Sequence, residues 1–263
     1  MKKLMLFSFT LSSILSFNII QTKTISAVFF DIETIFHTNS MRASGYIGKI
    51  DSLRYLSSVG HLPSQEDLFK QLKPVKAKSS EITYNKNLEM PLIFSDWLAN
   101  KEASAKIKDI ISKYFANKNI SDVEKRVLYA IVSMMLTPQH LSDTQEVDTK
   151  MIKIVEKLRS LNVKRFLVGN WAHIASLKTA FYDVFKLFNG VYVSGDLHLL
   201  KPSLEFYQTV LSSAGVTAEQ AVWVEAEPKF IAKAKSYGFH VASCIDKNYE
   251  SVSQTLRQLG MSV

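Results

Sequence analysis

The segment VFFDIETIF, residues 28–36, guides the interpretation of the rest of the chain. Together with the residues just before it, it forms a short apolar run from Ile25 to Phe30. A run this short, continuous rather than alternating, is typical of a strand covered on both faces. Asp31 follows directly. The segment therefore predicts a buried strand that presents an acidic side chain at its carboxyl end.

Four further β-rich apolar runs occur later, and stretches with helical spacing separate them. The runs are residues 165–168, 191–193, 221–224 and 239–242. The helical stretches cover 171–188, a segment from Pro202 to Gly215, and a segment from Pro228 to Gly238. Strands that alternate with helices are typical of parallel sheets with crossover connections. The sequence predicts an α/β fold with a Rossmann-like parallel sheet.

The long interval between the first two strands has helical character. Candidate helices are residues 49–58, 65–72, 103–115, 122–135 and 146–161, and residues 73–88 are predicted to form a loop. Their apolar residues fall on single faces, as Ile107, Ile111 and Tyr114 do. We expect an inserted α-helical cap over residues 38–159, and a core made of residues 23–37 plus 160–263. An independent domain between two halves of the core is the alternative.

The N-terminal 22 residues resemble a signal peptide in their pattern. Lys2 and Lys3 precede an apolar run over residues 4–20, which is the order of charge and hydrophobicity that export signals have. The sequence therefore predicts export, to the periplasm or out of the cell. The alternatives are an uncleaved membrane anchor through residues 4–20 and a buried terminal helix.

The net charge indicates the kind of partner to expect, and the cysteine content excludes two kinds of structural site. The formal net charge is +8, which favours acidic partners such as phosphorylated ligands. The lysines are spread without a dense basic run, so no specific nucleic-acid partner is expected. Cys244 is the only cysteine, which excludes an internal disulfide and a multi-cysteine zinc site. It lies in an apolar run, so we predict a buried, unreactive thiol.

Residues that could bind a ligand follow the carboxyl ends of the predicted strands. They are Asp31 and Glu33 after the first strand, Gly169 (through its backbone N–H) and Asn170 after the second, and Glu225 and Glu227 after a later one. Lys201 stands just before a helix. In an open parallel sheet, ligands bind beyond these strand ends. Carboxylates are suitable ligands for magnesium, and helix N-termini suit phosphate. The pattern predicts a site for a metal and a phosphorylated ligand.

Four segments together resemble the haloacid dehalogenase (HAD) superfamily. Residues 28–36 are similar to its first motif, an apolar strand that ends in Asp-x-Asp-Gly. The segment RFLVGNW, residues 165–171, stands where the second motif belongs. VSGDLHLLKPSLEFY, residues 193–207, resembles the third, and VWVEAEPKFIAKAKSYG, residues 222–238, resembles the fourth. The resemblance covers about residues 25–37 and 160–260, and it implies a HAD-like core with a helical cap inserted after the first motif.

The resemblance also implies residue roles. Asp31 would be the nucleophile that forms an aspartyl-phosphate intermediate, Glu33 the general acid and base, and Lys201 the cation that neutralises nucleophile and phosphate. Gly169 and Asn170 occupy the phosphate-binding position. Magnesium would be held by Asp31, by the backbone carbonyl of Glu33 and by Glu225. A small phosphorylated substrate is the implied partner.

Several positions depart from the family pattern. Glu33 and Glu225 replace aspartates, Thr34 replaces a glycine, Gly169 replaces a serine or threonine, and Ala226 stands where a second acid is usual. Misplacement of catalytic groups by about 1 Å can cost roughly a hundredfold in rate. We therefore expect a magnesium-dependent HAD-like phosphatase of low activity. The alternative is a catalytically impaired HAD-fold protein that acts as an exported binding or effector protein.

The same residues could instead have structural roles without any part in catalysis. Asp31 and Lys201 could form a structural ion pair, and Asn170 could cap a helix. Glu225 and Glu227 could be charges that suit a helix N-terminus. A haloacid dehalogenase in the strict sense is disfavoured, because that branch lacks an acid two residues after the nucleophile.

Overall fold

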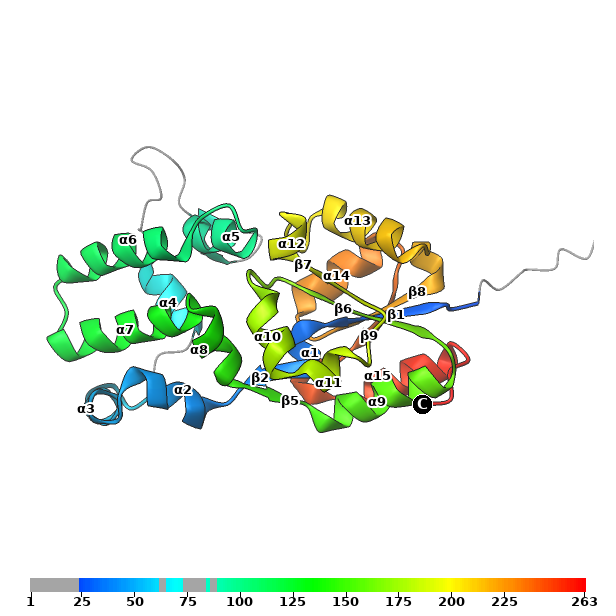
Figure 1. Ribbon diagram of the computed structural model, residues 1–263, viewed down its shortest axis with the longest axis horizontal. Helices are drawn as coiled ribbons and strands as arrows, with labels where there is room; N and C mark the ends of the chain where they lie inside the picture. Colours follow the sequence, from blue (N-terminus) through cyan, green and yellow to red (C-terminus); the bar gives the residue numbers. More distant parts are fainter. Residues whose placement is uncertain (1–23, 62–64, 73–83, 86–88) are drawn as a thin grey trace, which may run out of the picture.

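The computed structural model describes residues 24–61, 65–72, 84–85 and 89–263. These residues form two lobes, a sheet-containing core and a helical cap (Figure 1). The signal-peptide-like segment lies outside the described residues, so export and membrane anchoring stay predictions. Within the described ranges, no helix combines the length and apolar character that a membrane span needs.

The core is built on a five-stranded sheet in the order β7-β6-β1-β8-β9. All four neighbouring pairs are parallel. The strands are β1 (Ala27–Asp31), β6 (Lys164–Gly169), β7 (Gly190–Val193), β8 (Ala221–Glu225) and β9 (His240–Ser243). Each predicted apolar run thus contributes one strand. The predicted parallel α/β sheet is confirmed, with β1 at its centre.

Helices cover both faces of this sheet. Val28 and Phe30 of β1 face a cluster that includes α9 (Thr149–Ser160), α10 (Ile174–Ala180) and α15 (Tyr249–Gln258). Ala27 and Phe29 face the opposite side, where α13 (Leu204–Ala214) and α14 (Pro228–Ser236) pack. Burial on both faces explains why the central strands β1, β6 and β8 are continuously apolar. In Figure 1, α13 and α14 lie above the sheet, and α9 and α15 lie below it.

The core helices differ in detail from the predicted segments. The stretch 171–188 contains two short helices, α10 and α11 (Tyr182–Phe185), instead of one. Helix α13 begins after Pro202, because the Ser203 side chain accepts a hydrogen bond from the Phe206 N–H and so caps the helix. Shorter turns complete the core: α1 (Ile32–Ile35), α12 (Ser194–Leu197), η1 (Ala218–Gln220) and η2 (Ile245–Lys247).

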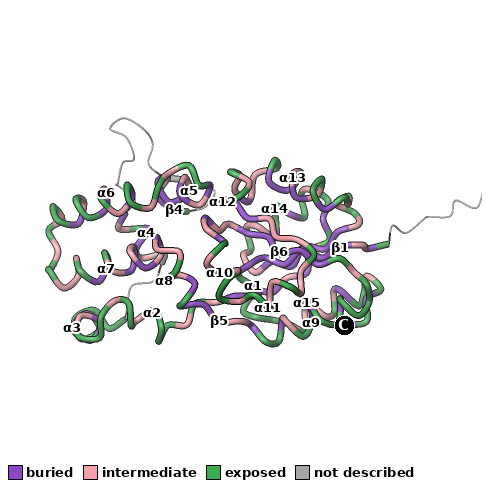
Figure 2. The backbone as a smooth tube through the Cα atoms, in the orientation of Figure 1, coloured by how far each residue is buried: buried purple, intermediate pink, exposed green. Residues whose placement is uncertain are grey.

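The cap has its own hydrophobic core. Its helices are α2 (Ser40–Ile47), α3 (Lys49–Val59), α4 (Gln65–Leu72), α5 (Leu92–Leu98), α6 (Ser104–Ala116), α7 (Asp122–Met135) and α8 (Pro138–Asp143). Residues such as Ile107, Ile111 and Leu128 are fully buried between α6 and α7. Figure 2 shows buried backbone on the inner sides of these helices and exposed backbone on the outer sides.

The helical prediction for the cap holds for α3, α4, α6 and α7, whereas α2, α5 and α8 were not predicted. Helix α2 buries none of its residues and α8 buries only Ser142, so neither has an apolar face to detect. The predicted loop over residues 73–88 lies outside the described residues, except for β3 (Tyr84–Asn85), which pairs with β4 (Met90–Pro91).

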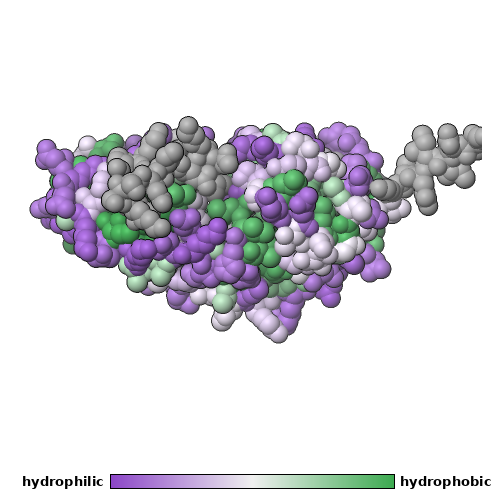
Figure 3. Space-filling view, turned by 90° about the horizontal axis from the view of Figure 1, so that it is seen from above, coloured by the Kyte–Doolittle hydropathy of each residue, from purple (hydrophilic) through white to green (hydrophobic). Residues whose placement is uncertain are grey.

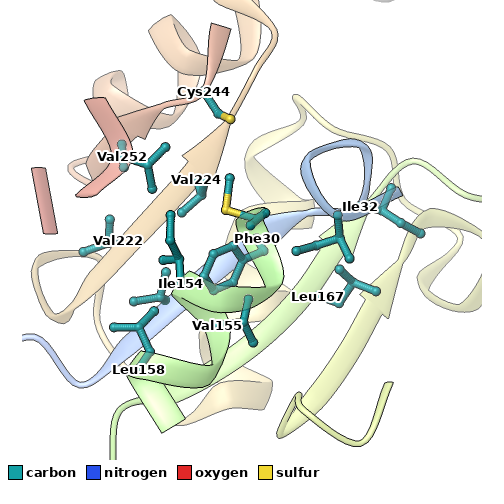
Figure 4. Close-up of a cluster of buried hydrophobic side chains, with 14 of the residues drawn as sticks. Phe30, Ile32, Ile154, Val155, Leu158, Leu167, Val222, Val224, Cys244 and Val252 are labelled. Carbon is teal, nitrogen blue, oxygen red and sulfur yellow. The ribbon is translucent and has the colours of Figure 1, made fainter. Parts of the chain in front are cut away.

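A two-stranded antiparallel ribbon connects the lobes. It pairs β2 (Phe36–Thr38) with β5 (Gln145–Val147), and α9 follows directly. Figure 4 shows Ile154, Val155 and Leu158 of α9 next to Phe30 of the sheet. In its packing α9 therefore goes with the core, although the predicted cap boundary at residue 159 placed it in the cap. An amphipathic pattern reveals an apolar face, but not the surface against which that face packs.

Cys244 is buried in the same cluster, as predicted. Burial raises the pKa of its thiol to about 11, and the nearby Asp148 carboxylate adds to the effect. The thiol is therefore neutral at physiological pH and acts as a small apolar side chain.

Candidate active site

Strand register brings the first, second and fourth motifs to one edge of the sheet. Phe30 of β1 pairs with Val224 of β8, and Asp31 pairs with Val168 of β6. Gly169 and Glu225 each come one residue after these partners. Parallel strands end at the same edge, so Asp31, Gly169 and Glu225 lie together at the carboxyl ends of β1, β6 and β8.

A tight helical turn holds the Asp31 side chain. Asp31 occupies the N-cap position of α1, and its Oδ1 accepts a hydrogen bond from the Glu33 N–H at 2.9 Å. The Thr34 hydroxyl donates to the Asp31 carbonyl at 2.6 Å. Thr34, which stands where the family pattern has glycine, does not adopt a positive φ here. The turn therefore accepts threonine, and its hydroxyl adds a hydrogen bond.

Lys201 lies between two carboxylates. It is only 1% exposed, and its ammonium contacts Asp31 Oδ2 and lies 2.7 Å from Glu225 Oε2. The same ammonium lies 4.6 Å from the centre of the Phe230 ring, a cation–π contact. Burial by itself would lower the pKa of Lys201, but the neighbouring carboxylates outweigh it and raise the pKa above its ordinary value. The ammonium is therefore charged.

The side-chain amide of Asn170 forms two hydrogen bonds with the backbone of Lys201. Its Oδ1 accepts from the Lys201 N–H at 2.9 Å, and its Nδ2 donates to the Lys201 carbonyl at 3.2 Å. Asn170 does not cap the next helix, because the N-cap position of α10 is His173. Its predicted role in substrate binding stays a prediction; in the structure its amide positions the lysine.

We expect Asn170→Ala to lower kcat/KM for the phosphate-ester hydrolysis expected from the sequence by at least about tenfold. The reason is that Lys201 loses two hydrogen bonds that set its position. Both hydrogen bonds also contribute to folding, so a stability loss of about 1–2 kcal/mol should accompany the change. Asn189→Ala is the matched control: Asn189 accepts from the Arg165 N–H at 2.9 Å, at the start of β6 and far from the site along the strands. Equal activity losses in the two variants would contradict a positioning role.

The carboxylate of Glu225 is held from two sides. Lys201 contacts its Oε2, and the N–H groups of Ala226 and Glu227 donate to its Oε1 at 3.0 and 3.1 Å. Burial is the largest cause that raises the pKa of Glu225; together with the charge on Asp31, and opposed by Lys201, it brings this pKa to about 7. The predicted alternative of a charge at a helix N-terminus thus describes part of its environment, because α14 begins three residues later.

Glu33 projects beside Asp31 into a cavity. Its side chain is accessible to solvent within this partly open cavity. Desolvation by the surrounding protein, followed by repulsion from Asp31, raises the pKa of Glu33 to about 7. A carboxyl group with a pKa near neutrality can both give and take a proton.

Gly169 is packed against Ile32. A Cβ added at residue 169 would lie 2.6 Å from the Cγ2 methyl of Ile32, which is itself 1% exposed. The same Cβ would lie 3.5 Å from Asp31 Oδ2. The missing serine or threonine at this position is therefore linked to the branched side chain at residue 32, a relation that no sequence pattern reveals.

We expect Gly169→Ser alone to destabilise the protein by about 1–3 kcal/mol, because it overpacks this contact. Leucine lacks the branch at Cβ, so Ile32→Leu/Gly169→Ser should regain part of the loss. The rest should remain, because Gly169 has a φ of 158°, which residues other than glycine rarely adopt. Urea denaturation of the two variants and of Ile32→Leu checks this. A serine that costs nothing in the Ile32 background would show that the methyl group moves aside freely.

A cavity of about 820 Å³ lies above these groups, between the sheet edge and the cap. Asp31, Glu33, Asn170 and Lys201 belong to its lining, and Trp171 forms part of the wall. Its other apolar lining residues were not predicted, because most of them come from segments far from the motifs: Phe36, Ile47, Met90, Trp97, Leu98, Ile131, Met134, Met135, Leu141 and Phe230. Of these, only Phe36, at the end of the first motif segment, and Phe230, within the fourth, belong to the motifs.

The donor set fits a magnesium ion. Two carboxylates, Asp31 and Glu225, share the single ammonium of Lys201, so one negative charge in the buried cluster is uncompensated. Among the described residues, no group of three or more His, Cys, Asp or Glu side chains is placed to hold a metal. Magnesium is usually held by one or two carboxylates, with waters and substrate oxygens completing its shell. Asp31 and Glu225 with the Glu33 carbonyl are consistent with that pattern.

Several solved structures align with most of this chain. A HAD-family enzyme from Bacteroides thetaiotaomicron aligns over 84% of this chain and 94% of its own, with 16% identity and a TM-score of 0.54. A protein described as a predicted HAD-like family hydrolase, from Porphyromonas gingivalis, aligns over 90% and 98%, also with 16% identity and a TM-score of 0.54. The chain has the haloacid dehalogenase-like fold.

Other proteins with the HAD-like fold match to a similar degree. A dehalogenase aligns over 89% of this chain and 96% of its own, with 13% identity and a TM-score of 0.54. The Bacteroides enzyme has also been solved in complex with magnesium and inorganic phosphate, and that structure matches with 16% identity and a TM-score of 0.52. No family model matches the sequence, and no curated protein matches it. The predicted HAD-like core with a helical cap is confirmed as a fold.

Proposed function

We propose that the protein is a HAD-like hydrolase, and specifically a magnesium-assisted phosphatase that uses Asp31 as its nucleophile. The observation that carries the proposal is the contact of Asp31 with the buried Lys201 at the floor of a cavity that is partly open to solvent. A buried ammonium beside a carboxylate reduces the repulsion between that carboxylate and an approaching phosphate. Glu33 stands two residues away, with a pKa near neutrality.

In the first step, Asp31 Oδ attacks phosphorus and forms an oxygen–phosphorus bond while the bond to the ester oxygen breaks. The protonated Glu33 gives its proton to the departing alcohol oxygen. In the second step, a water molecule attacks the phosphorus, its proton passes to the Glu33 carboxylate, and the bond to Asp31 breaks. Inorganic phosphate leaves, and both carboxyl groups return to their starting states.

Magnesium would be held by Asp31, Glu225 and the Glu33 carbonyl, and when bound it would supply a positive charge that offsets the charge on phosphate. Lys201 remains between the two carboxylates and keeps them in place. The cofactor proposal also draws on the Bacteroides enzyme, whose structure was solved with magnesium and phosphate.

Phosphate release from p-nitrophenyl phosphate, with and without magnesium, tests the proposal. We expect magnesium-dependent hydrolysis that Asp31→Asn abolishes. Calorimetric titration should also detect magnesium binding to the wild type and a clear loss in Asp31→Asn/Glu225→Gln, because that variant keeps no ionised carboxylate beside Lys201. Equal magnesium binding by both proteins would contradict the proposed ligands.

One observation favours the second candidate, a HAD-fold protein that binds but does not turn over its ligand. The Ile32 methyl would lie 2.6 Å from a Cβ at residue 169, so this position has no room for the side chain whose hydroxyl donates to phosphate in the family pattern. Loss of a single preorganised donor can cost about 10²–10³ in rate. Binding of inorganic phosphate by the wild type, without hydrolysis of any phosphate ester in the presence of magnesium, would favour this candidate.

A further inference from the structure

The cavity is polar at its floor and apolar on its walls. The acidic groups and Lys201 lie at the sheet edge, whereas the cap faces them mainly with apolar side chains. Met90, Trp97, Ile131 and Met134 line the cavity and are at most 8% exposed, so they are fixed in the cap's core. Viewed from above, hydrophobic residues show near the middle of the molecule and on the core lobe, and a smaller hydrophobic patch shows on the cap beside the grey residues (Figure 3).

Several polar groups on the walls are engaged within the protein. The Gln145 amide donates to the Leu141 carbonyl at 3.2 Å. The Trp97 indole N–H donates to the Ser104 hydroxyl at 3.0 Å, so the ring offers the cavity only its apolar surface. These groups are therefore poor partners for the hydroxyls of a polyol ligand.

The lysine at the edge of the cavity has a partner, because Lys229 forms an ion pair with Glu89 at 3.3 Å. His37 Nε2 lies 3.7 Å from Glu146 Oε2, whereas its buried Nδ1 has no hydrogen-bond partner. The ring of Phe230 lies on the side chain of Lys201 and extends the apolar wall down to the floor. A ligand would therefore meet polar groups at its phosphate end and apolar surface around its other end.

We propose that the cavity takes phosphate esters of apolar alcohols, with a straight or aromatic hydrocarbon part, in preference to phosphate esters of polyols. The proposal rests on the proposed function for the phosphate end and adds the class of the leaving alcohol. A sugar hydroxyl would exchange water for an apolar wall and lose hydrogen bonds without replacement. A hydrocarbon chain instead gains roughly fourfold in affinity for each methylene that it buries.

Binding of two phosphonates, which cannot be hydrolysed at the carbon–phosphorus bond, tests the ligand class without depending on catalysis. Calorimetry would compare hexylphosphonate with ethylphosphonate on the full chain in the presence of magnesium. Four additional methylenes predict at least about tenfold tighter binding of the hexyl compound. Two of the three tryptophans, Trp97 and Trp171, line the cavity, so hexylphosphonate should also shift tryptophan emission to shorter wavelength.

A matched pair of variants locates the effect. Met135→Gln places an amide in the cavity wall at a half-buried position of α7, and we expect it to reduce the hexyl-to-ethyl affinity ratio at least about threefold. Met41→Gln is the same substitution in the same lobe, at a residue that is 84% exposed and outside the cavity lining, and it should leave the ratio unchanged. If Met135→Gln does not fold, the emission shift in the wild type decides the location.

The outcomes separate this inference from the proposed function. Equal affinities for the two phosphonates, or a preference without any change in tryptophan emission, would overturn the inference. Hydrolysis of hexyl phosphate and ethyl phosphate, both esters of primary alcohols, is measured in parallel. Chain-length-dependent phosphonate binding without hydrolysis of either ester would support the ligand class and refute the phosphatase. Hydrolysis of both esters with equal kcat/KM, together with equal affinities for the two phosphonates, would support the phosphatase and refute the proposed ligand class.

Discussion

Asp31→Asn is expected to lose at least about a thousandfold in phosphate-ester hydrolysis, because the amide cannot act as the nucleophile. The folded state should be as stable as that of the wild type, or more stable. Asp31 and Glu225 share one ammonium in a buried cluster, and removal of one negative charge leaves a neutral pair of Lys201 and Glu225. Steady-state kinetics and urea denaturation measure the two effects separately.

Asp183→Asn is the control for this experiment, since Asp183 is an aspartate whose side chain is 93% exposed and paired with Lys186 on the surface. It should change neither activity nor stability noticeably. An Asp31→Asn protein that is clearly less stable than the wild type would mean that the charge of Asp31 is needed to hold the lysine in place. The structural ion-pair role considered from the sequence would then dominate.

Lys201→Met is expected to destabilise the protein by about 3–5 kcal/mol and to abolish activity. Methionine keeps most of the volume of lysine but leaves two buried carboxylates facing each other without a cation, and breaking a buried ionic cluster in this way is costly. The free energy of unfolding from urea titration is the measurement. It should be supported by circular dichroism, to establish that a folded state exists in water.

Two further variants test the cause of that loss. Lys113→Met removes an exposed ion pair in which Lys113 Nζ lies 2.7 Å from Asp109 Oδ2, the same distance as between Lys201 and Glu225. This change should lower the free energy of unfolding by no more than about 1 kcal/mol. The triple variant Asp31→Asn/Lys201→Met/Glu225→Gln has no charge in the cluster and should regain much of the stability lost in Lys201→Met. A triple variant as unstable as the single one would show that packing of the lysine stem, rather than charge, causes the loss.

Strand patterns and motif order in the sequence were sufficient to predict the core. Five apolar runs became five parallel strands, and the reason is clearest for the central strands β1, β6 and β8, which are buried on both faces and need continuous apolar residues. The motif residues reached one edge for the same reason: parallel strands all end on the same side. The cap was predicted as helical, but its short helices and the place of α9 were not, since these depend on contacts between segments far apart in sequence.

The sequence by itself determined the α/β class, the alternation of strands and helices along the chain, and the acidic edge that includes Asp31 and Glu225. Only the tertiary structure decided what those groups do to one another. Lys201 forms ion pairs with both carboxylates, Asn170 forms hydrogen bonds with the backbone of the lysine, and Ile32 occupies the space beside Gly169. The physical reason is range: periodicity records whether each residue faces a core or solvent, whereas pKa values, ion pairs and packing depend on distances of a few ångströms between residues up to 170 positions apart.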